Sequence, residues 1–316
     1  MKLKTSPYIS VVVPLLNEEK NIEVLYNALI ITLKDVSENY EIIFVDDGSS
    51  DKSFEVIQRL NSQNERIVGI SFSRNFGHQI GLAAGLHHAK GEIVISMDAD
   101  MQHPPEIIPQ LVEKYREGFD IVNTRRIDPK SIGFFKKTSS KMFYKFFNSF
   151  SDIKIESASS DFRLMSRKAV EAYNQIDERD RFTRGLVKWI GFKQSIVAYN
   201  AAERFAGKSK YTLKKMIKFA LTGITSFSSK PLRLSFYLGL FVFVFGIFYS
   251  IFAIVMHFLG FTVQGWTSMF VTIMILGGIQ LLSIGIIGEY IGKIFIESKH
   301  RPLYFIKNQT SNLYES

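Results

Sequence analysis

The stretch IVISMDADMQH, residues 93–103, decides the fold of this chain. Its apolar start belongs to a predicted strand at residues 92–97, and Asp98 and Asp100 follow where that strand ends. Side chains alternate along a strand, so two carboxylates one residue apart point the same way. A divalent cation relieves their mutual repulsion, and oxygen ligands suit Mg²⁺ or Mn²⁺. The stretch therefore predicts a buried strand that ends in a site for a metal-bound diphosphate.

The same alternation of apolar strands and helical patterns extends through the first half of the chain. Strands are predicted at residues 9–13, 41–45, 67–72, 92–97 and 120–123, with helices at 18–36, 51–61, 78–89 and 104–116. Near-continuous apolar strands separated by helices predict a mainly parallel sheet covered on both faces. Asn17-Glu18, Asp46-Asp47 and Asp98-Asp100 follow three of these strands. Because ligands bind beyond the carboxyl ends of parallel strands, these polar pairs predict one common site.

The composition argues against several classes of site and partner. The chain has no cysteine, so it forms neither a disulfide nor a thiolate metal site. Residues 14–17 read Pro-Leu-Leu-Asn after the first strand, where a dinucleotide-binding fold has a glycine-rich loop. Residues 1–204 hold 28 Lys and Arg against 27 Asp and Glu, whereas residues 205–316 hold 11 against 3. A basic excess that flanks hydrophobic segments favours a membrane over a nucleic acid as partner.

Two uncharged segments, residues 234–256 and 266–288, are predicted to span a membrane. Each exceeds the roughly 20 residues that a helix needs to cross a bilayer. The link between them lacks Lys and Arg, while basic residues flank the pair, so the positive-inside rule places both termini and the active site in the cytoplasm. The expected organisation is a catalytic domain (1–204), a juxtamembrane amphipathic segment (205–233), a membrane hairpin (234–288) and a cytoplasmic tail (289–316). A basic, aromatic-rich stretch at 130–150 fits an interfacial helix and a core-packed helix equally well.

Ordered motifs along nearly the whole chain carry a family resemblance. They are VVVPLLNE (11–18), VDDGSSD (45–51), SRNFG (73–77), DADMQHPPE (98–106), SSDFRL (159–164) and GKSKY (207–211). With these motifs the chain resembles the inverting family 2 glycosyltransferases of the GT-A fold. More narrowly, it is similar to membrane-anchored polyprenyl-phosphate glycosyltransferases related to dolichol-phosphate mannose synthase. The resemblance implies an α/β fold: a Rossmann-like, mainly parallel GT-A domain, followed by interfacial helices and a two-helix transmembrane hairpin.

The resemblance implies roles for the residues that match these motifs. On the donor side, Pro14 and Glu18 line the nucleotide pocket, Asp46 or Asp47 accepts a hydrogen bond from a uracil base, and Asp98 lies near the ribose and the metal. Asp100 and Gln102 bind Mg²⁺ or Mn²⁺, and Asp161 faces the acceptor and the anomeric carbon. Asp100 and Asp161 are thus the expected catalytic pair. The expected contacts to phosphates and acceptor are Arg125, Arg126, Arg163, Arg204, Ser209 and Lys210.

The expected activity is transfer of one sugar from a nucleotide-diphosphate sugar, UDP-glucose or UDP-N-acetylglucosamine, to polyprenyl phosphate. Two other interpretations stay open: a processive polysaccharide synthase, and a non-catalytic membrane scaffold. The first is disfavoured because Gly185 and Lys188 stand where the Gln-x-x-Arg-Trp element of such synthases has Gln and Arg. Glycines at 277, 278, 285 and 288 are typical of close helix packing, either in a homo-oligomer or within the hairpin itself. A flippase and a downstream glycosyltransferase are further expected partners.

Overall fold

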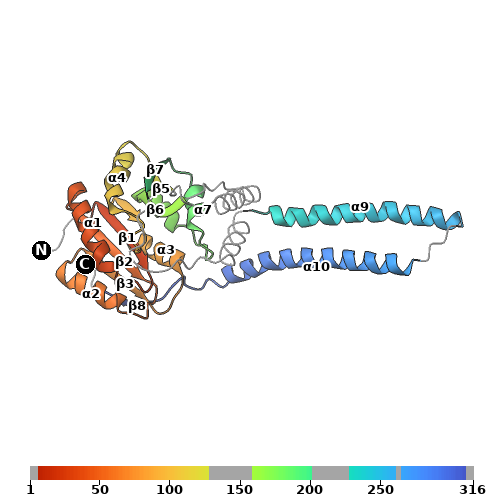
Figure 1. The fold of residues 1–316 in the computed structure, drawn as a ribbon, viewed down its shortest axis with the longest axis horizontal. Coiled ribbons are helices and arrows are strands. Elements are labelled where there is room, and N and C mark those ends of the chain that lie inside the picture. Colours follow the sequence, from red (N-terminus) through yellow and green to blue (C-terminus); the bar gives the residue numbers. More distant parts are fainter. Residues whose placement is uncertain (1–5, 128–158, 201–227, 261–264, 311–316) are drawn as a thin grey trace. The chain divides into compact units, whose positions relative to one another are not determined.

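The computed structural model describes residues 6–127, 159–200, 228–260 and 265–310 (Figure 1). The chain divides into two compact units. The first holds the described residues up to 200 together with residues 301–310, and the second holds residues 228–260 and 265–300. The last described residues therefore belong to the unit that opens the chain.

The described part of the first unit is built on a mixed sheet of eight strands. In chain order these are β1 (Ile9–Leu15), β2 (Tyr40–Asp46), β3 (Ile67–Phe72), β4 (Ile93–Ser96), β5 (Ile121–Ile127), β6 (Ser159–Ser166), β7 (Gln194–Asn200) and β8 (Ile306–Gln309). Their order across the sheet is β7-β5-β6-β4-β1-β2-β3-β8. The four central strands β4, β1, β2 and β3 run parallel, whereas β6 runs antiparallel to both of its neighbours and β8 runs antiparallel to β3.

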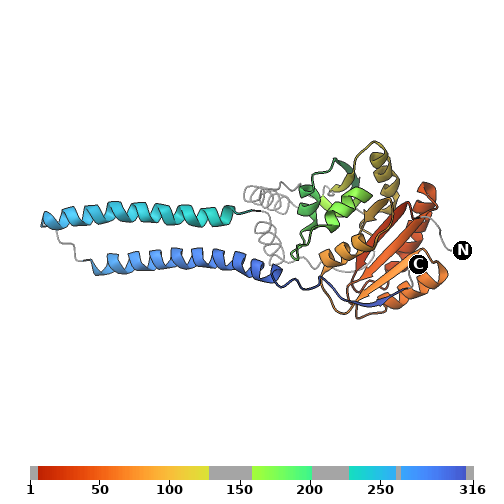
Figure 2. The same ribbon diagram turned by 180° about the vertical axis from the view of Figure 1, so that it is seen from behind.

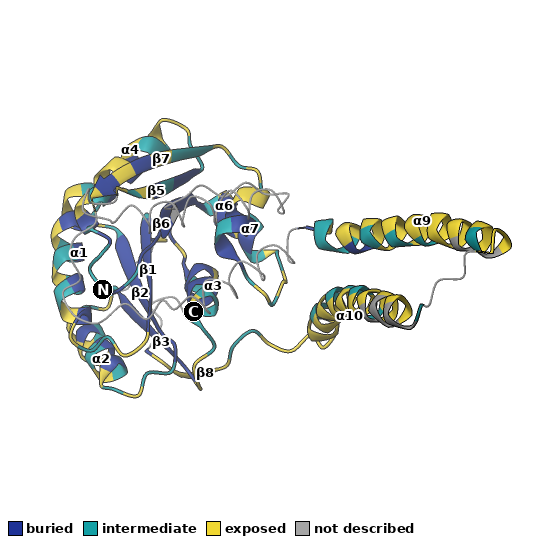
Figure 3. Cartoon of the chain, turned by 45° about the vertical axis from the view of Figure 1, so that its right-hand side comes forward, coloured by how far each residue is buried: buried dark blue, intermediate teal, exposed yellow. Residues whose placement is uncertain are grey.

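Helices cover both faces of this sheet, which explains why the central strands are buried throughout (Figure 3). One face carries α1 (Ile22–Val36), α2 (Ser53–Gln63) and α4 (Ile108–Arg116), the last preceded by a 3₁₀ turn at Pro105–Ile107. The other face carries α3 (His78–His88), α6 (Arg167–Asn174) and α7 (Thr183–Trp189). The predicted strands and helices of residues 9–123 are thus confirmed, with boundaries that shift by a few residues.

Helix α3 packs closely on the sheet because it presents glycines to it. A Cβ at Gly85 would lie 2.1 Å from Cγ1 of Val12 in β1, and one at Gly81 would lie 3.3 Å from Cβ of Pro14. This close approach places the first residue of α3, His78, next to the carboxyl ends of β1 and β4.

The C-terminal residues do not form a simple tail. Residues 306–309, expected to follow the hairpin as part of a tail at 289–316, form edge strand β8 against β3 (Figure 2). Without β8, strand β3 would be the edge of the sheet and would expose unpaired backbone groups that another strand can bind. The sequence pattern of residues 306–309 does not by itself indicate that they form this strand. Any cut between the catalytic domain and the hairpin therefore removes a strand from the sheet.

The second unit contains two long apolar helices, α9 (Lys230–Phe258) and α10 (Trp266–Glu297). Both are long and apolar enough to cross a membrane, which confirms the two predicted segments as helices. A Cβ at Gly277, Gly278, Gly285 or Gly288 would meet no described atom within 4 Å, so these glycines do not pack the hairpin against itself there. The predicted helix at 130–150 and residues 205–227 of the predicted juxtamembrane segment lie outside the described residues, and the last residues of that segment, 230–233, already belong to α9.

The two glycines of α3 predict unequal effects of substitution by alanine. Both Gly81→Ala and Gly85→Ala gain about 1 kcal/mol of helix propensity. The methyl group that alanine adds at position 85, however, collides with Val12. Overpacking of this kind costs about 1–3 kcal/mol. We therefore expect the purified Gly85→Ala protein to melt well below the Gly81→Ala protein in a thermal unfolding assay. Equal melting temperatures would contradict the close packing of α3 on β1.

Candidate functional site

The site lies where β4 ends beside its antiparallel neighbour β6. Ser96, at the end of β4, pairs with Arg163 of β6, and the Ser96 hydroxyl donates a 2.6 Å hydrogen bond to the backbone oxygen of Asp161. Asp98 follows directly after β4, so two acidic segments far apart in the sequence meet at one edge. This pairing places the metal-site stretch beside the expected acceptor residue.

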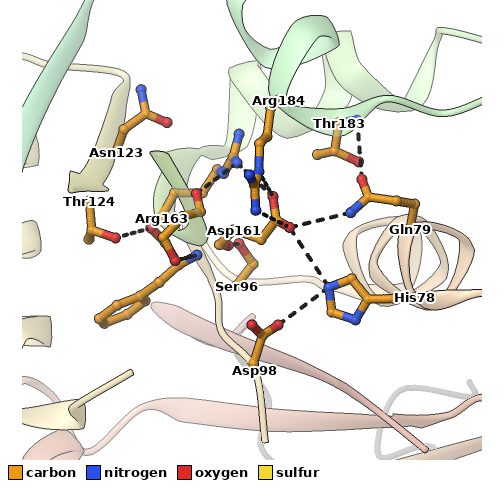
Figure 4. A network of polar contacts seen from close by, with 12 residues as sticks. His78, Gln79, Ser96, Asp98, Asn123, Thr124, Asp161, Arg163, Thr183 and Arg184 are labelled. Carbon is orange, nitrogen blue, oxygen red and sulfur yellow. Dashed lines mark hydrogen bonds and ion pairs between the residues drawn. The ribbon is translucent and has the colours of Figure 1, made fainter. Parts of the chain in front are cut away.

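Asp161 is buried and held by cationic and polar side chains from three elements (Figure 4). Its Oδ1 accepts hydrogen bonds from the guanidinium groups of Arg163 of β6 and Arg184 of α7, each at 3.1 Å. Its Oδ2 accepts from Arg184 at 3.3 Å and from the amide of Gln79 of α3 at 3.3 Å. Gln79 also accepts a hydrogen bond from the backbone N–H of Thr183, which ties α3 to the start of α7.

These contacts keep Asp161 ionised. Burial alone raises the pKa of a carboxyl group, but the charges of Arg184, Arg163 and His78 outweigh burial here and hold the pKa of Asp161 well below its usual range. A carboxylate with such a low pKa is a weak proton acceptor. Asp161 is therefore suited to hold charge and position neighbouring groups rather than to act as a general base.

His78 stands between the two acidic segments. Its Nε2 lies 3.3 Å from Oδ1 of Asp98 and 3.9 Å from Oδ2 of Asp161. The imidazole is 43% exposed, so it is open to an incoming ligand as well. His78 thus links the carboxylate expected on the donor side to the one expected on the acceptor side.

His103 locks the loop that carries Asp98 and Asp100. The backbone N–H of Asp98 donates to its Nδ1 at 2.9 Å, and its Nε2 lies 2.7 Å from the hydroxyl of Ser160. Because Nδ1 accepts, a neutral ring carries its proton on Nε2 and donates it to Ser160. The buried ring also stacks on Phe162 at 5.2 Å between centroids. His103 therefore ties the metal-site loop to β6 one residue before Asp161.

The residues of this loop fit a divalent cation that is shared with a diphosphate. Oδ1 of Asp98 is buried and accepts no hydrogen bond from the part of the chain that the structure describes. Among the described residues no three His, Cys, Asp or Glu side chains gather into a closed metal site. An open set of two carboxylates and the amide oxygen of Gln102 suits Mg²⁺ or Mn²⁺, which take further ligands from substrate phosphates.

The backbone of the same loop is strained at Met101, which has a φ of 61°, a conformation that residues with a side chain rarely adopt.

The expected nucleotide residues lie at the ends of β1 and β2. Pro14 is buried in β1, and the carboxylate of Glu18 accepts a hydrogen bond from Asn21 at 2.5 Å. The carboxylate of Asp46 accepts from the backbone N–H of Ser49 and from the Ser71 hydroxyl. Asp47 accepts from the backbone N–H groups of Phe76 and Gly77, and burial raises its pKa. Both aspartates thus shape the turn, and a contact of either with a base stays a prediction.

The expected phosphate-binding residues lie in different surroundings. Arg125 is exposed on β5, and Arg126 donates to the side-chain oxygen of Gln102 at 3.4 Å, so Arg126 lies next to the metal-site loop. Arg163 is only 2% exposed, and its NH2 group donates to Asp161 and to the backbone of Ser160. Arg163 therefore serves Asp161 instead of offering its charge at a surface. Arg204, Ser209 and Lys210 lie outside the described residues.

Four residues of the site are not among the predicted site residues: His78, Gln79, His103 and Arg184. His78 and Gln79 follow the SRNFG motif directly and open a helix, a signal that could have marked them. Arg184 has no local signal, because its role depends on how α7 packs beside β6.

The contacts of His103 predict a loss of stability when its ring is replaced. His103→Leu leaves the buried Asp98 N–H and the Ser160 hydroxyl without their partner, and each such loss costs about 1–3 kcal/mol. We expect a melting temperature several degrees below that of His87→Leu, an exposed control position on α3. Unfolding of the two purified variants, followed by circular dichroism, gives the comparison. If they melt together, His103 does not lock the loop.

Comparison with known proteins shows the family of the chain. The family model described as glycosyl transferase family 2 matches residues 10–173, and the model described as GtrB C-terminal hairpin matches residues 230–294. The uncharacterized glycosyltransferase YkcC of Bacillus subtilis is 44% identical over 94% of this chain and 93% of its own length. The uncharacterized glycosyltransferase sll0501 of Synechocystis is 43% identical over 95% of each chain.

A third relative has a named activity. The bactoprenol glucosyl transferase of Shigella phage SfV is 45% identical over 95% of this chain and 98% of its own length. These matches run through both the catalytic domain and the hairpin. The chain is therefore a glycosyltransferase that belongs to family 2, with a C-terminal hairpin of the GtrB type.

Proposed function

We propose that this enzyme transfers a single glucose unit from UDP-glucose to a polyprenyl phosphate, with inversion at the anomeric carbon. The observation that carries the proposal is the meeting of Asp98 and Asp161 across β4 and β6. It supports a donor and an acceptor that react between these two carboxylates. The relatives named bactoprenol glucosyl transferase support glucose and a polyprenol over other choices, and N-acetylglucosamine is the second candidate sugar.

The ionised state of Asp161 fits a phosphate acceptor. A phosphate monoester has a second pKa near 6, so it is largely a dianion at neutral pH. Its oxygen forms the bond to the anomeric carbon while the bond from that carbon to the UDP oxygen breaks, and no proton has to be removed. The negative charge of Asp161 would then stabilise the positive charge that develops on the sugar. Arg184 and His78, which both lie against Asp161, would attract the anionic acceptor.

The donor side needs charge of the opposite sign. Mg²⁺ or Mn²⁺, held by Asp98, Asp100 and Gln102, would stabilise the departing diphosphate. Arg126 lies beside Gln102 and supplies a fixed positive charge to the same region. His103 keeps this loop in place.

The fold supports a site on the cytoplasmic side of a membrane. The catalytic domain precedes α9, and β8, which belongs to the same sheet, follows α10. If α9 and α10 each cross the bilayer once, both of their outer ends lie on the side of the catalytic domain. The lysines and arginines that flank the hairpin favour the cytoplasm as that side. A homo-oligomer, a flippase and a downstream glycosyltransferase stay predictions.

The central test uses membranes that contain the full-length protein, labelled UDP-glucose and undecaprenyl phosphate. We expect label in the lipid extract only when Mg²⁺ or Mn²⁺ is present. Asp100→Asn keeps the side-chain size but removes a charge that faces the diphosphate, so transfer should fall at least about 100-fold. Glu113→Gln, at an exposed position on α4 outside the motifs, is the matched control and should stay active. Label in a water-soluble polymer would instead indicate a processive synthase, and nucleotide binding without transfer would indicate a scaffold.

Arg184 tests the proposed role of Asp161. Arg184→Met keeps the length of the side chain but removes its charged hydrogen bonds to Asp161. Charged hydrogen bonds are worth about 1.5–3 kcal/mol, which corresponds to a loss of about 10- to 150-fold in kcat. Arg181→Met is the control, because Arg181 donates to the backbone of Ile176 and Glu178 instead. Equal rates for the two variants would argue against a catalytic role for the Asp161–Arg184 pair.

A further inference from the structure

The C-terminal segment, residues 301–310, connects the end of the hairpin to the catalytic sheet. Only residues 298–305 separate Glu297, the last residue of α10, from Ile306, the first residue of β8. This short connection makes the segment the direct covalent link from the second apolar helix to the glycosyltransferase domain.

The segment is anchored to the outer edge of β3. The backbone N–H of Thr310 donates to the backbone oxygen of Gly69 at 2.9 Å, and the Thr310 hydroxyl accepts from the N–H of Gly69 at 2.8 Å. Thr310 is buried although it lies near the end of the chain. The segment thus ends in a specific attachment.

The start of the segment packs on the loop that leads from β3 to α3, residues 73–77. The backbone N–H of Ser73 donates to the backbone oxygen of Phe305 at 2.9 Å. The ring of Tyr304 stacks on Phe72 at 4.8 Å between centroids, and the ring of Phe305 lies 6.4 Å from that of Phe76. Phe305 therefore contacts this loop directly, and Tyr304 contacts it through Phe72, the last residue of β3, whose ring lies 5.7 Å from that of Phe76.

The other side of the loop is held by the turn after β2. The carboxylate of Asp47 accepts hydrogen bonds from the N–H groups of Phe76 at 2.6 Å and Gly77 at 2.9 Å. A Cβ at Gly48 would lie 2.5 Å from the backbone of Arg74, so this turn and the loop are in direct contact. Gly77 has a φ of 107°, which a side chain would oppose, and it leads directly into His78. The loop thus connects Asp47, expected at the nucleotide, to His78, which lies between Asp98 and Asp161.

We propose that Tyr304 and Phe305 are positioning residues for the nucleotide sugar: they hold the 73–77 loop in the conformation that places Asp47 and His78. The chain after the membrane hairpin thereby sets the affinity for the donor. This inference rests on the proposed function for the identity of the donor. It gives the C-terminal segment a role in catalysis in addition to closing the sheet edge.

The test compares full-length variants in lipid nanodiscs. Phe305→Ala and Tyr304→Ala remove one aromatic pair each, whereas Tyr304→Phe keeps the ring that stacks on Phe72. Lys307→Ala, an exposed position on β8, is the matched control. We expect the two alanine variants to raise the KM for UDP-glucose and the Kd for UDP about 3- to 10-fold, the range of an aromatic pair. The KM for undecaprenyl phosphate should rise less than the KM for UDP-glucose, because Arg184 still holds Asp161 when His78 shifts. Tyr304→Phe and Lys307→Ala should behave like the unmodified protein.

Two results would overturn the inference. One is an unchanged Kd for UDP in both alanine variants. The other is an equal rise in both KM values together with a lower melting temperature, which is what a purely structural role produces. Phe305 is 57% exposed, so its replacement leaves the core intact and keeps the test informative if Tyr304→Ala does not fold. If the unmodified protein binds UDP but transfers no sugar to the lipid, the proposed function fails, while the UDP affinities of the variants still decide this inference.

Discussion

The structure depends on how negative charge is held at the carboxyl edge of the sheet. Asp98 and Asp161 lie there on either side of His78, and like charges held close together repel. Arg163 and Arg184 compensate Asp161 so fully that its pKa falls well below the usual range despite burial. Asp98 has no such arginine partner among the contacts described: His78 lies 3.3 Å from its Oδ1 and His103 lies 3.7 Å from its Oδ2. The site therefore holds two carboxylates in different electrostatic surroundings. Asp161 is balanced by arginines and suits the acceptor side, whereas Asp98 suits a cation.

The fold produces this separation through the antiparallel strand β6, which pairs with β4. Strand β6 runs against β4, so Asp161 enters the site from the opposite direction to Asp98 and lies beside it. Helix α3 then brings His78 and Gln79 to both, and its glycines allow the close approach to β1 that this requires. His103 ties the loop that follows β4 to strand β6. Each of these groups is placed by backbone that belongs to the core, which gives a rigid arrangement for a reaction that depends on charge.

Much of this could be predicted from the sequence, and the rest could not for physical reasons. Burial in a parallel sheet or in lipid demands continuous apolar residues, so such elements can be recognised from the local sequence. This holds for the strands at 9–13, 41–45 and 67–72 and for the two long uncharged segments. Strand β8 has none: its residues are exposed, and it forms because β3 offers an unpaired edge. Arg184 likewise acquires its role only from the packing of α7. Motifs indicated which carboxylates meet, but not which cations hold them.

The most direct test of this account is a crystal structure of the full-length protein with UDP and Mn²⁺, with the manganese located by its anomalous signal. The account predicts one ion between the diphosphate and the oxygens of Asp98, Asp100 and Gln102, with Asp161 still paired to Arg163 and Arg184. UDP bound at the sheet edge with no ion at those oxygens, or an ion bound by Asp161 instead, would contradict it.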